Sequence, residues 1–315
     1  MNIGYAVAKK ACFITPAKFL FNVGKTPKEW NKKMLNDEHL TVAMCEMDCT
    51  KIFSESKFEG GVVITYRDSE VEFGKIETFT PFPLLNKIRS KVVNATDFSS
   101  LSSIVYPQNK FNLKKLYEDY PDCKEKIGSK GKEKRLTTSI FETIDIFKTT
   151  ATSESDISIL GLIGNNRVQR FINVKYLETH KNLKKYKIAI PKSNGSGAIG
   201  KVIPTPLIGE PVLLSPYSGF TQSFISMGAF DSYEEAQAIL KYVKSKFART
   251  LLGVLKATQD NNKDTWEFVP LQDFTANSQI KWDKSIVEID QQLYAKYNLT
   301  EEEISFIESM IKPME

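Results

Sequence analysis

Residues 60–66 read GGVVITY, a β-branched run entered through paired glycines, and this pattern predicts a strand. Two more strands are predicted at residues 11–15 (ACFIT) and residues 40–47. Between them, residues 26–29 (TPKE) combine a Thr N-cap, a Pro in the first turn and a Glu in the capping-box position, which predicts a helix start. This strand–helix–strand–strand series of about 70 residues is too short to close a doubly wound sheet, so we expect that part of a larger sheet is missing before the first residue.

The rest of the chain alternates short β-rich runs with helical patterns. Residues 107–135 form a polar, lysine-rich passage with a flexible-looking stretch, GSKGKEK, at residues 128–134. A Ser/Thr-rich loop at residues 149–156 indicates an internal boundary. Strands are predicted after it at residues 157–163, 170–174, 186–190, 198–203, 211–215 and 220–225. Helices are predicted at residues 82–92, 232–254, 286–297 and 301–312, the last of them capped by Thr300 with Glu303.

The composition is that of a globular protein. The 315 residues include 43 Lys+Arg and 38 Asp+Glu, for a formal net charge of +5, and this length suits about two domains. No apolar run approaches the roughly 18 to 20 residues of a membrane helix, and the first residues resemble no secretory signal. We therefore expect neither a membrane protein nor a secreted one. The four cysteines form no CxxC pair and the two histidines lie far apart in sequence, which favours reduced thiols in a cytoplasmic protein without a zinc site.

Positive charge is concentrated in one part of the chain. Residues 283–315 hold 8 acidic and 3 basic residues, a charge of −5, which leaves +10 on residues 1–282. Residues 166–201 alone hold nine basic residues and one acid. A polyanion partner explains this stretch, and so does a solvated lysine-rich face; the charge alone does not decide between them.

Two polar segments suit contacts with a nucleic acid. The glycines of residues 193–200 (SNGSGAIG) are followed by a β-rich run and a proline and not by the helix that a nucleotide-binding GxGxxG loop requires. Their small residues nevertheless expose backbone N–H groups between Lys192 and Lys201. Residues 258–262 (TQDNN) follow a helical pattern and offer amide side chains, which pair with adenine edges. An ordinary hairpin turn and an ordinary helix end remain the alternatives.

The sequence predicts no catalytic residue and no metal site. No Ser lies in a GxSxG motif, and neither His has a local partner. Glu70, Glu72 and Lys75 have the residue types of a nuclease metal site without the paired strand context that such a site needs.

Several strings resemble one family over most of the chain. The first part contains FITPAKFL at 13–20, WNKKMLND at 30–37 and GGV at 60–62. The later part contains YPQN at 106–109, PTPLIGEP at 204–211, TQSF at 221–224, KFAR at 246–249 and WEFVPLQDF at 266–274. Together these strings resemble the C-terminal part of adenine-N6 DNA methyltransferases of type II restriction-modification systems, including those fused to an endonuclease.

The resemblance implies both a fold and a departure from the family. It implies an α+β chain in which residues 1–79 are the C-terminal remnant of a Rossmann-like methyltransferase sheet. Residues 80–315 then form a mixed α/β target-recognition domain with C-terminal helices. The family binds S-adenosylmethionine through a glycine-containing loop and holds the extruded adenine with an Asn-Pro-Pro-Tyr motif, and this chain contains neither. We therefore expect a truncated, DNA-binding chain that holds no cofactor and is not catalytic alone.

Double-stranded DNA is the expected partner, with phosphate and base contacts from different side chains. Phosphate contacts are predicted for Arg167, Arg170, Lys184, Lys185, Lys192 and Lys201. Contacts to bases or the adjacent backbone are predicted for Asn194, Ser196, Gln222, Gln259 and Asn261. Two alternatives stay open: one half of a split methyltransferase that is active with a partner chain, and an interaction protein that binds no DNA. Because strand edges near the first residues lose their neighbours, self-association or a partner is also expected there.

Overall fold

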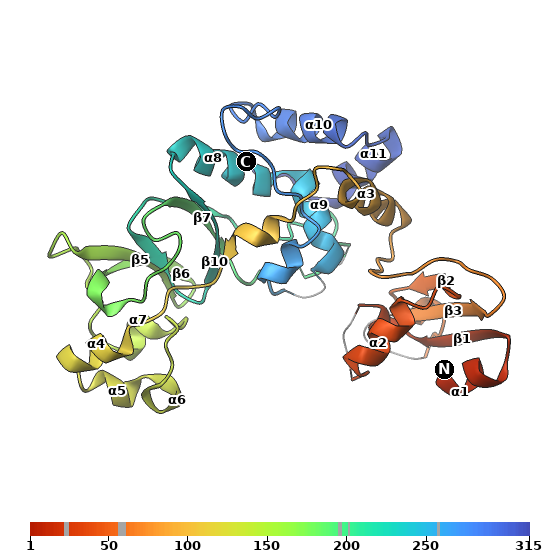
Figure 1. Ribbon diagram of the computed structural model, residues 1–315, viewed down its shortest axis with the longest axis horizontal. Coiled ribbons are helices and arrows are strands. Elements are labelled where there is room, and N and C mark those ends of the chain that lie inside the picture. Colours follow the sequence, from red (N-terminus) through yellow and green to blue (C-terminus); the bar gives the residue numbers. More distant parts are fainter. Residues whose placement is uncertain (22–24, 56–60, 195–196, 201, 257–258) are drawn as a thin grey trace. The chain divides into compact units, whose positions relative to one another are not determined.

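The computed structural model describes residues 1–21, 25–55, 61–194, 197–200, 202–256 and 259–315 (Figure 1). It is a mixed α/β structure of several sheets and helices, in agreement with the predicted α+β class. The chain divides into two compact units, Met1–Lys87 and Ile88–Glu315. The division falls inside α3 (Pro83–Val93), whereas the resemblance places the domain boundary after residue 79. In the part of the chain that is described, no helix has the length and apolarity needed to cross a bilayer.

The first unit is a three-stranded sheet with its helices on one side. Its strands are β1 (Lys10–Pro16), β2 (Leu40–Glu46) and β3 (Val62–Asp68), in the order β1-β3-β2. Its helical segments are α1 (Asn2–Val7), α2 (Lys28–Leu35) and the 3₁₀ turns Ala17–Phe21 and Cys49–Lys51. All three predicted strands are confirmed. Because β3 is antiparallel to both neighbours, β1 and β2 run in the same direction, with α2 between them in the chain.

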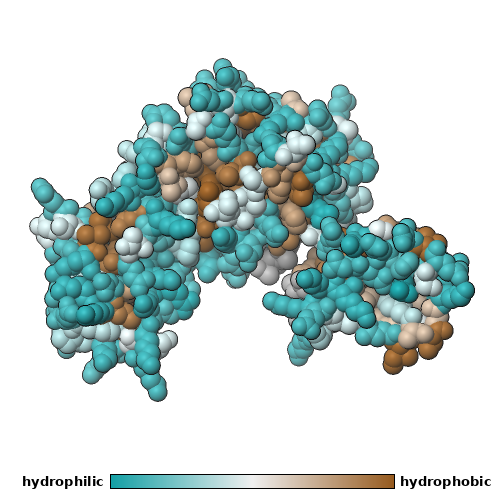
Figure 2. Space-filling model, viewed as in Figure 1, coloured by the Kyte–Doolittle hydropathy of each residue, from teal (hydrophilic) through white to brown (hydrophobic). Residues whose placement is uncertain are grey.

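Two details of this unit differ from expectation. The N-cap of α2 is Pro27, not the preceding Thr, and its side chain cannot cap the helix because it contains no hydrogen-bond acceptor. The core lies on one sheet face, where Phe19, Met34 and Val63 are buried. On β1 and β2, Ile14 is 57% exposed and Met44 45% exposed. Hydrophobic surface (brown) is also visible at the lower edge of this unit in Figure 2.

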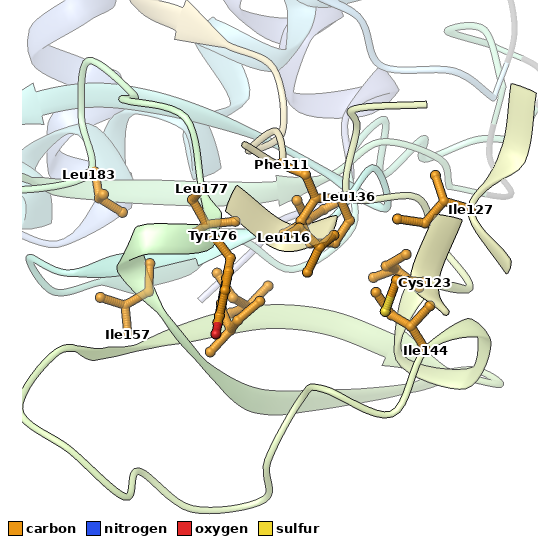
Figure 3. Close-up of a cluster of buried hydrophobic side chains, with 13 residues drawn as sticks. Phe111, Leu116, Cys123, Ile127, Leu136, Ile144, Ile157, Tyr176, Leu177 and Leu183 are labelled. Carbon is orange, nitrogen blue, oxygen red and sulfur yellow. The ribbon is translucent and has the colours of Figure 1, made fainter. Parts of the chain in front are cut away.

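The second unit begins with short helices packed on a hairpin. The helices are α4 (Leu113–Asp119), α5 (Cys123–Lys126), α6 (Gly128–Gly131) and α7 (Ile140–Thr143). The hairpin is β5 (Asp156–Ile163) and β6 (Asn166–Asn173), and β9 (Ser218–Phe220) lies parallel to β5. Figure 3 shows their shared core, in which Leu116, Cys123 and Ile127 of the helical segment lie with Ile144, Ile157 and Tyr176. The lysine-rich passage at residues 107–135 therefore contributes buried apolar residues to a core, which its polar composition conceals.

A four-stranded antiparallel sheet continues this unit. Its order is β4 (Val105–Tyr106), β10 (Phe224–Phe230), β7 (Tyr186–Pro191) and β8 (Val212–Leu214). Leu160, Ala189 and Phe220 belong to one buried cluster that joins this sheet to the β5 sheet. The predicted strand at 220–225 is wrong as one element, because β9 ends at Phe220 and β10 begins at Phe224. The predicted strand at 198–203 is also wrong, since its described residues form turns and bends.

Helices complete the second unit. They are α8 (Tyr233–Lys244), α9 (Lys246–Leu255), α10 (Ile286–Lys296) and α11 (Glu301–Met310), with 3₁₀ turns at Leu101–Ile104, Val174–Tyr176 and Lys263–Trp266. The capping box of α11 at Thr300 and Glu303 is confirmed. The single helix predicted at 232–254 is divided at Ser245, whose backbone is extended and whose hydroxyl accepts from the N–H of Ala248.

Candidate functional site

An open groove of about 850 Å³ in the second unit brings together side chains from distant parts of the chain. Most of its lining is hydroxyl or amide: Thr137, Thr138, Ser139, Asn165, Ser193, Gln222, Ser223 and Asn262. Its charged lining is Arg167, Lys192 and Asp260, and its apolar lining is Leu162, Pro191 and Phe224. Two cations and one carboxylate among neutral hydrogen-bonding groups suit a ligand that carries both phosphate and polar heterocycles.

One wall of the groove is built where the two predicted polar segments meet. The N–H of Asn194 donates to the carbonyl of Gln259 at 3.1 Å, and the N–H of Asn261 donates to the carbonyl of Lys192 at 2.6 Å. Ser193 and Asp260 pair between them as an antiparallel bridge. Four residues predicted from separate segments are therefore neighbours in the structure.

Asn261 is a structural member of this wall. Its side chain is 1% exposed, and its amide oxygen accepts from the indole N–H of Trp266 at 2.6 Å. Trp266 is itself fully buried, so this hydrogen bond satisfies a polar group in the core. A side chain held in this way is inaccessible to a DNA base, and we assign Asn261 a positioning role in place of the predicted base contact.

Arg167 lies at the start of β6 and is oriented by its surroundings. Its guanidinium donates to the carbonyl of Glu210, and its Cζ lies 5.9 Å from the ring centroid of Phe224. The side chain is exposed, so donors remain on its solvent side. A pre-oriented guanidinium is well suited to an anionic oxygen.

Gln222 joins the groove to a segment that sequence reasoning missed. Its backbone N–H donates to the carbonyl of Leu136 at 2.7 Å, which places it beside the hydroxyls of residues 137–139. The side chain of Gln222 is half-buried. No local pattern marks residues 137–139 as part of a site, because only this long-range pairing brings them to the groove.

Three other predicted residues, Arg170, Lys184 and Lys185, are not part of the groove lining. Arg170 is half-buried and donates to the carbonyl of its neighbour Gln169 at 3.0 Å. Lys184 is exposed, and Lys185 forms an ion pair with Asp231. Ser196 and Lys201 lie outside the described residues.

Two lysines of the second unit are buried and cannot meet a polyanion directly. Lys187 is fully buried on β7, and its Nζ donates to the carbonyls of Asn182 and Lys185, both at 2.9 Å. Lys256 is 1% exposed, and its Nζ donates to Oδ1 of Asn194 at 2.9 Å. Desolvation lowers the pKa of each ammonium group to about 8. Because Lys187 is one of the nine basic residues at 166–201, the charge of that segment overstates its accessible charge. Lys256 holds the side-chain amide of Asn194 in place.

The histidines have structural partners. Nδ1 of His39 lies 2.9 Å from the carbonyl of Val71, and Nε2 of His180 lies 3.0 Å from the carbonyl of Pro107. Burial lowers the pKa of His180. In the described ranges, His, Cys, Asp and Glu side chains form no group of three or more that could hold a metal ion.

Comparison with known families finds no family model that matches the chain, and comparison with curated proteins finds no match. Function must therefore be inferred from the chemistry of the groove itself. A guanidinium, an ammonium, amides and hydroxyls can bind phosphate oxygens and base edges.

Proposed function

We propose that the chain is a DNA-recognition module of a restriction-modification adenine methyltransferase, and that it is not catalytic on its own. One observation carries the proposal. Arg167 and Lys192, which the sequence selects for phosphate, and Gln222, which it selects for bases, line the same groove. Asn194 and Gln259 belong to the adjoining wall.

The composition of the groove supports a division of labour. Arg167 and Lys192 supply positive charge for phosphate oxygens, which sets the position of the chain on DNA without selecting a sequence. Gln222, Asn165 and the hydroxyl groups supply neutral donors and acceptors, which can distinguish base edges. The carboxylate of Asp260 repels phosphate but accepts from the exocyclic amine of cytosine, so its presence favours base contact over backbone contact alone.

A polarisation titration against a pool of random duplexes, followed by selection of the bound sequences, tests this proposal. We expect binding that weakens with salt, with a log–log slope of about −0.9 for each phosphate contacted, and a consensus among the selected duplexes. Absence of binding at about 20 mM salt contradicts DNA recognition, because counterion competition is weakest there. Binding without a consensus contradicts the sequence-specific part.

One half of a split adenine methyltransferase is a second candidate. The first unit supports it, because α2 connects β1 and β2, two strands that run in the same direction with the antiparallel β3 between them in the sheet. Strand–helix–strand crossovers between strands of the same direction are the units from which Rossmann-like sheets are built. Sheets of this kind normally have both faces covered, whereas Ile14 and Met44 are exposed. A partner chain with the cofactor loop and the Asn-Pro-Pro-Tyr motif would complete such a sheet.

Calorimetry and methyl transfer test the second candidate. The chain alone is expected to bind no S-adenosylmethionine, and mixing it with a chain that carries the missing motifs is expected to produce adenine methylation. A stoichiometric cofactor site in the isolated chain, or a mixture that neither associates nor transfers methyl groups, contradicts it.

A further inference from the structure

A tight turn in the second unit displays a concentration of lysines outside the groove. We call residues 124–134 the basic turn; it comprises the end of α5, all of α6 and the three residues that follow. Its exposed lysines are Lys124, Lys126, Lys130, Lys132 and Lys134. Lys126 is 3.6 Å from Asp145 and Lys134 is 2.7 Å from Glu178. Among the ion pairs of the described residues, none involves Lys124, Lys130 or Lys132.

The backbone of the basic turn is left-handed at three successive residues. Ser129 has φ 56°, Lys130 φ 55° and Gly131 φ 74°. Gly131 also lies so close to Lys124 that an added Cβ would be 2.7 Å from the Lys124 carbonyl oxygen. Left-handed backbone is unfavourable for any residue with a Cβ, so glycine or asparagine would suit position 130 better than lysine. Strained backbone of this kind is frequent at functional sites.

Hydrogen bonds hold the turn in this shape. The N–H of Gly131 donates to the carbonyl of Ile127 at 3.0 Å, and the N–H of Glu133 donates to the carbonyl of Gly128 at 3.1 Å. The hydroxyl of Tyr117 donates to the carbonyl of Gly131 at 2.7 Å. The stretch that looks flexible in sequence is therefore a fixed turn that presents its lysines in a defined arrangement.

The basic turn leads directly into the groove. The carbonyl of Lys134 accepts from the backbone N–H of Phe111, and the carbonyl of Leu136 accepts from the backbone N–H of Gln222. These two hydrogen bonds fix the segment that connects the basic turn to the groove. Thr137 of the groove lining is five positions after Lys132 in the chain, a reach of at most about 18 Å. Along duplex DNA that distance corresponds to about five base pairs, at about 3.4 Å for each.

We propose that the basic turn binds the sugar–phosphate backbone of the duplex next to the segment held in the groove. The contact is independent of sequence and anchors the module through Lys130 and Lys132. Mutual repulsion among the lysines is relieved when phosphates lie between them. This inference rests on the proposed DNA recognition and adds to it a flanking contact with its own residues.

Titration of the full chain with two duplexes tests it. Both carry the sequence selected by the groove; the short duplex ends at that sequence, the long duplex extends about 10 base pairs beyond it on each side, and both are titrated between about 50 and 200 mM salt. The double variant Lys130→Gln/Lys132→Gln is expected to lower the slope magnitude by about 2 on the long duplex and to leave the short duplex and the selected consensus unchanged. Lys28→Gln/Lys33→Gln is the matched control, because it removes the same charge from exposed positions of α2 in the first unit.

A third variant separates folding from binding. Lys130→Gly removes the charge and relieves the left-handed backbone, so we expect a Tm that is not lowered and a slope on the long duplex reduced by about 1. Equal slopes for the wild type and the Lys130→Gln/Lys132→Gln variant overturn the flanking contact while DNA recognition stands. An equal loss in the α2 control overturns it too, since the effect would then be one of net charge. If the wild type binds neither duplex, the proposed function itself fails.

Discussion

Lys187 allows a test of the structure through its pH dependence. Its ammonium group is fully buried and donates to the backbone carbonyls of Asn182, Lys185 and Ser215, and desolvation lowers its pKa from 10.5 to about 8. Because the folded pKa lies below the unfolded one, the unfolded chain binds more protons between pH 8 and 10.5, and stability must rise with pH in that window. At about 1.36 kcal/mol for each pH unit, the rise attributable to Lys187 is up to about 3 kcal/mol.

Urea unfolding of the wild type and a Lys187→Met variant measures this rise. Met keeps the length of the side chain without a titrating group, so the difference in free energy of unfolding isolates Lys187 from other groups. The wild type should gain on the variant by about 3 kcal/mol as the pH goes from about 7.5 to 10.5. Lys184→Met, a substitution at an exposed position, is the control. Because this variant keeps Lys187, the wild type should show no such gain over it. Curves for the wild type and Lys187→Met that stay parallel over this range refute the burial of the ammonium group.

Three further predictions concern the groove and the helices beside it. Asn261→Ala leaves the buried indole N–H of Trp266 without its acceptor and should lower the free energy of unfolding by about 1–3 kcal/mol in urea; an unchanged value would contradict the hydrogen bond. Asp290 is 3% exposed, and burial raises its pKa from 3.8 to about 6 although two backbone N–H groups donate to it. Because the folded chain then binds more protons than the unfolded chain, the free energy of unfolding should fall as the pH rises from 3.8 to about 6. Asp290→Asn should remove that decline in urea titrations, and a decline of the same size in the variant would exclude Asp290 as its source. Lys192→Ala should reduce the magnitude of the salt slope of DNA binding by about 0.9. Gln222→Ala should leave this slope unchanged and reduce the preference for one base, at one position of the site, by about 1–3 kcal/mol. Identical behaviour of the two variants in polarisation assays would argue against separate roles.

Local signals in the sequence predict the elements that local interactions determine. The β-branched run at residues 62–66 forms β3, and the capping box at Thr300 and Glu303 starts α11. Ser245 shows where such signals fail. A continuous apolar face runs through residues 236–254, yet the helix divides because Asp290, on α10, accepts from the N–H groups of Lys246 and Phe247 and so caps α9 from a distance. A window of sequence contains no sign of that partner.

The same limit applies to the groove. Residue type alone selected Arg167, Lys192 and Gln222, and the structure brings them together. Type alone could not tell that Lys187 and Asn261 are buried, because burial depends on which strand or turn packs over them. The apolar residues of the 107–135 passage occur singly among lysines, so their shared core becomes visible only when the hairpin at 156–173 is placed over them.

The groove also constrains the order in which the chain can fold. Its lining extends from Thr137 to Asn262, and its wall closes only when the segment at 259–261 pairs with residues 192–194. This pairing must also overcome the entropy of closing the intervening loop. During synthesis, a nascent chain that has assembled the hairpin still lacks a complete groove until the segment at 259–262 has left the ribosome. The ability to bind a ligand there would thus be acquired only after most of the second unit has been synthesised.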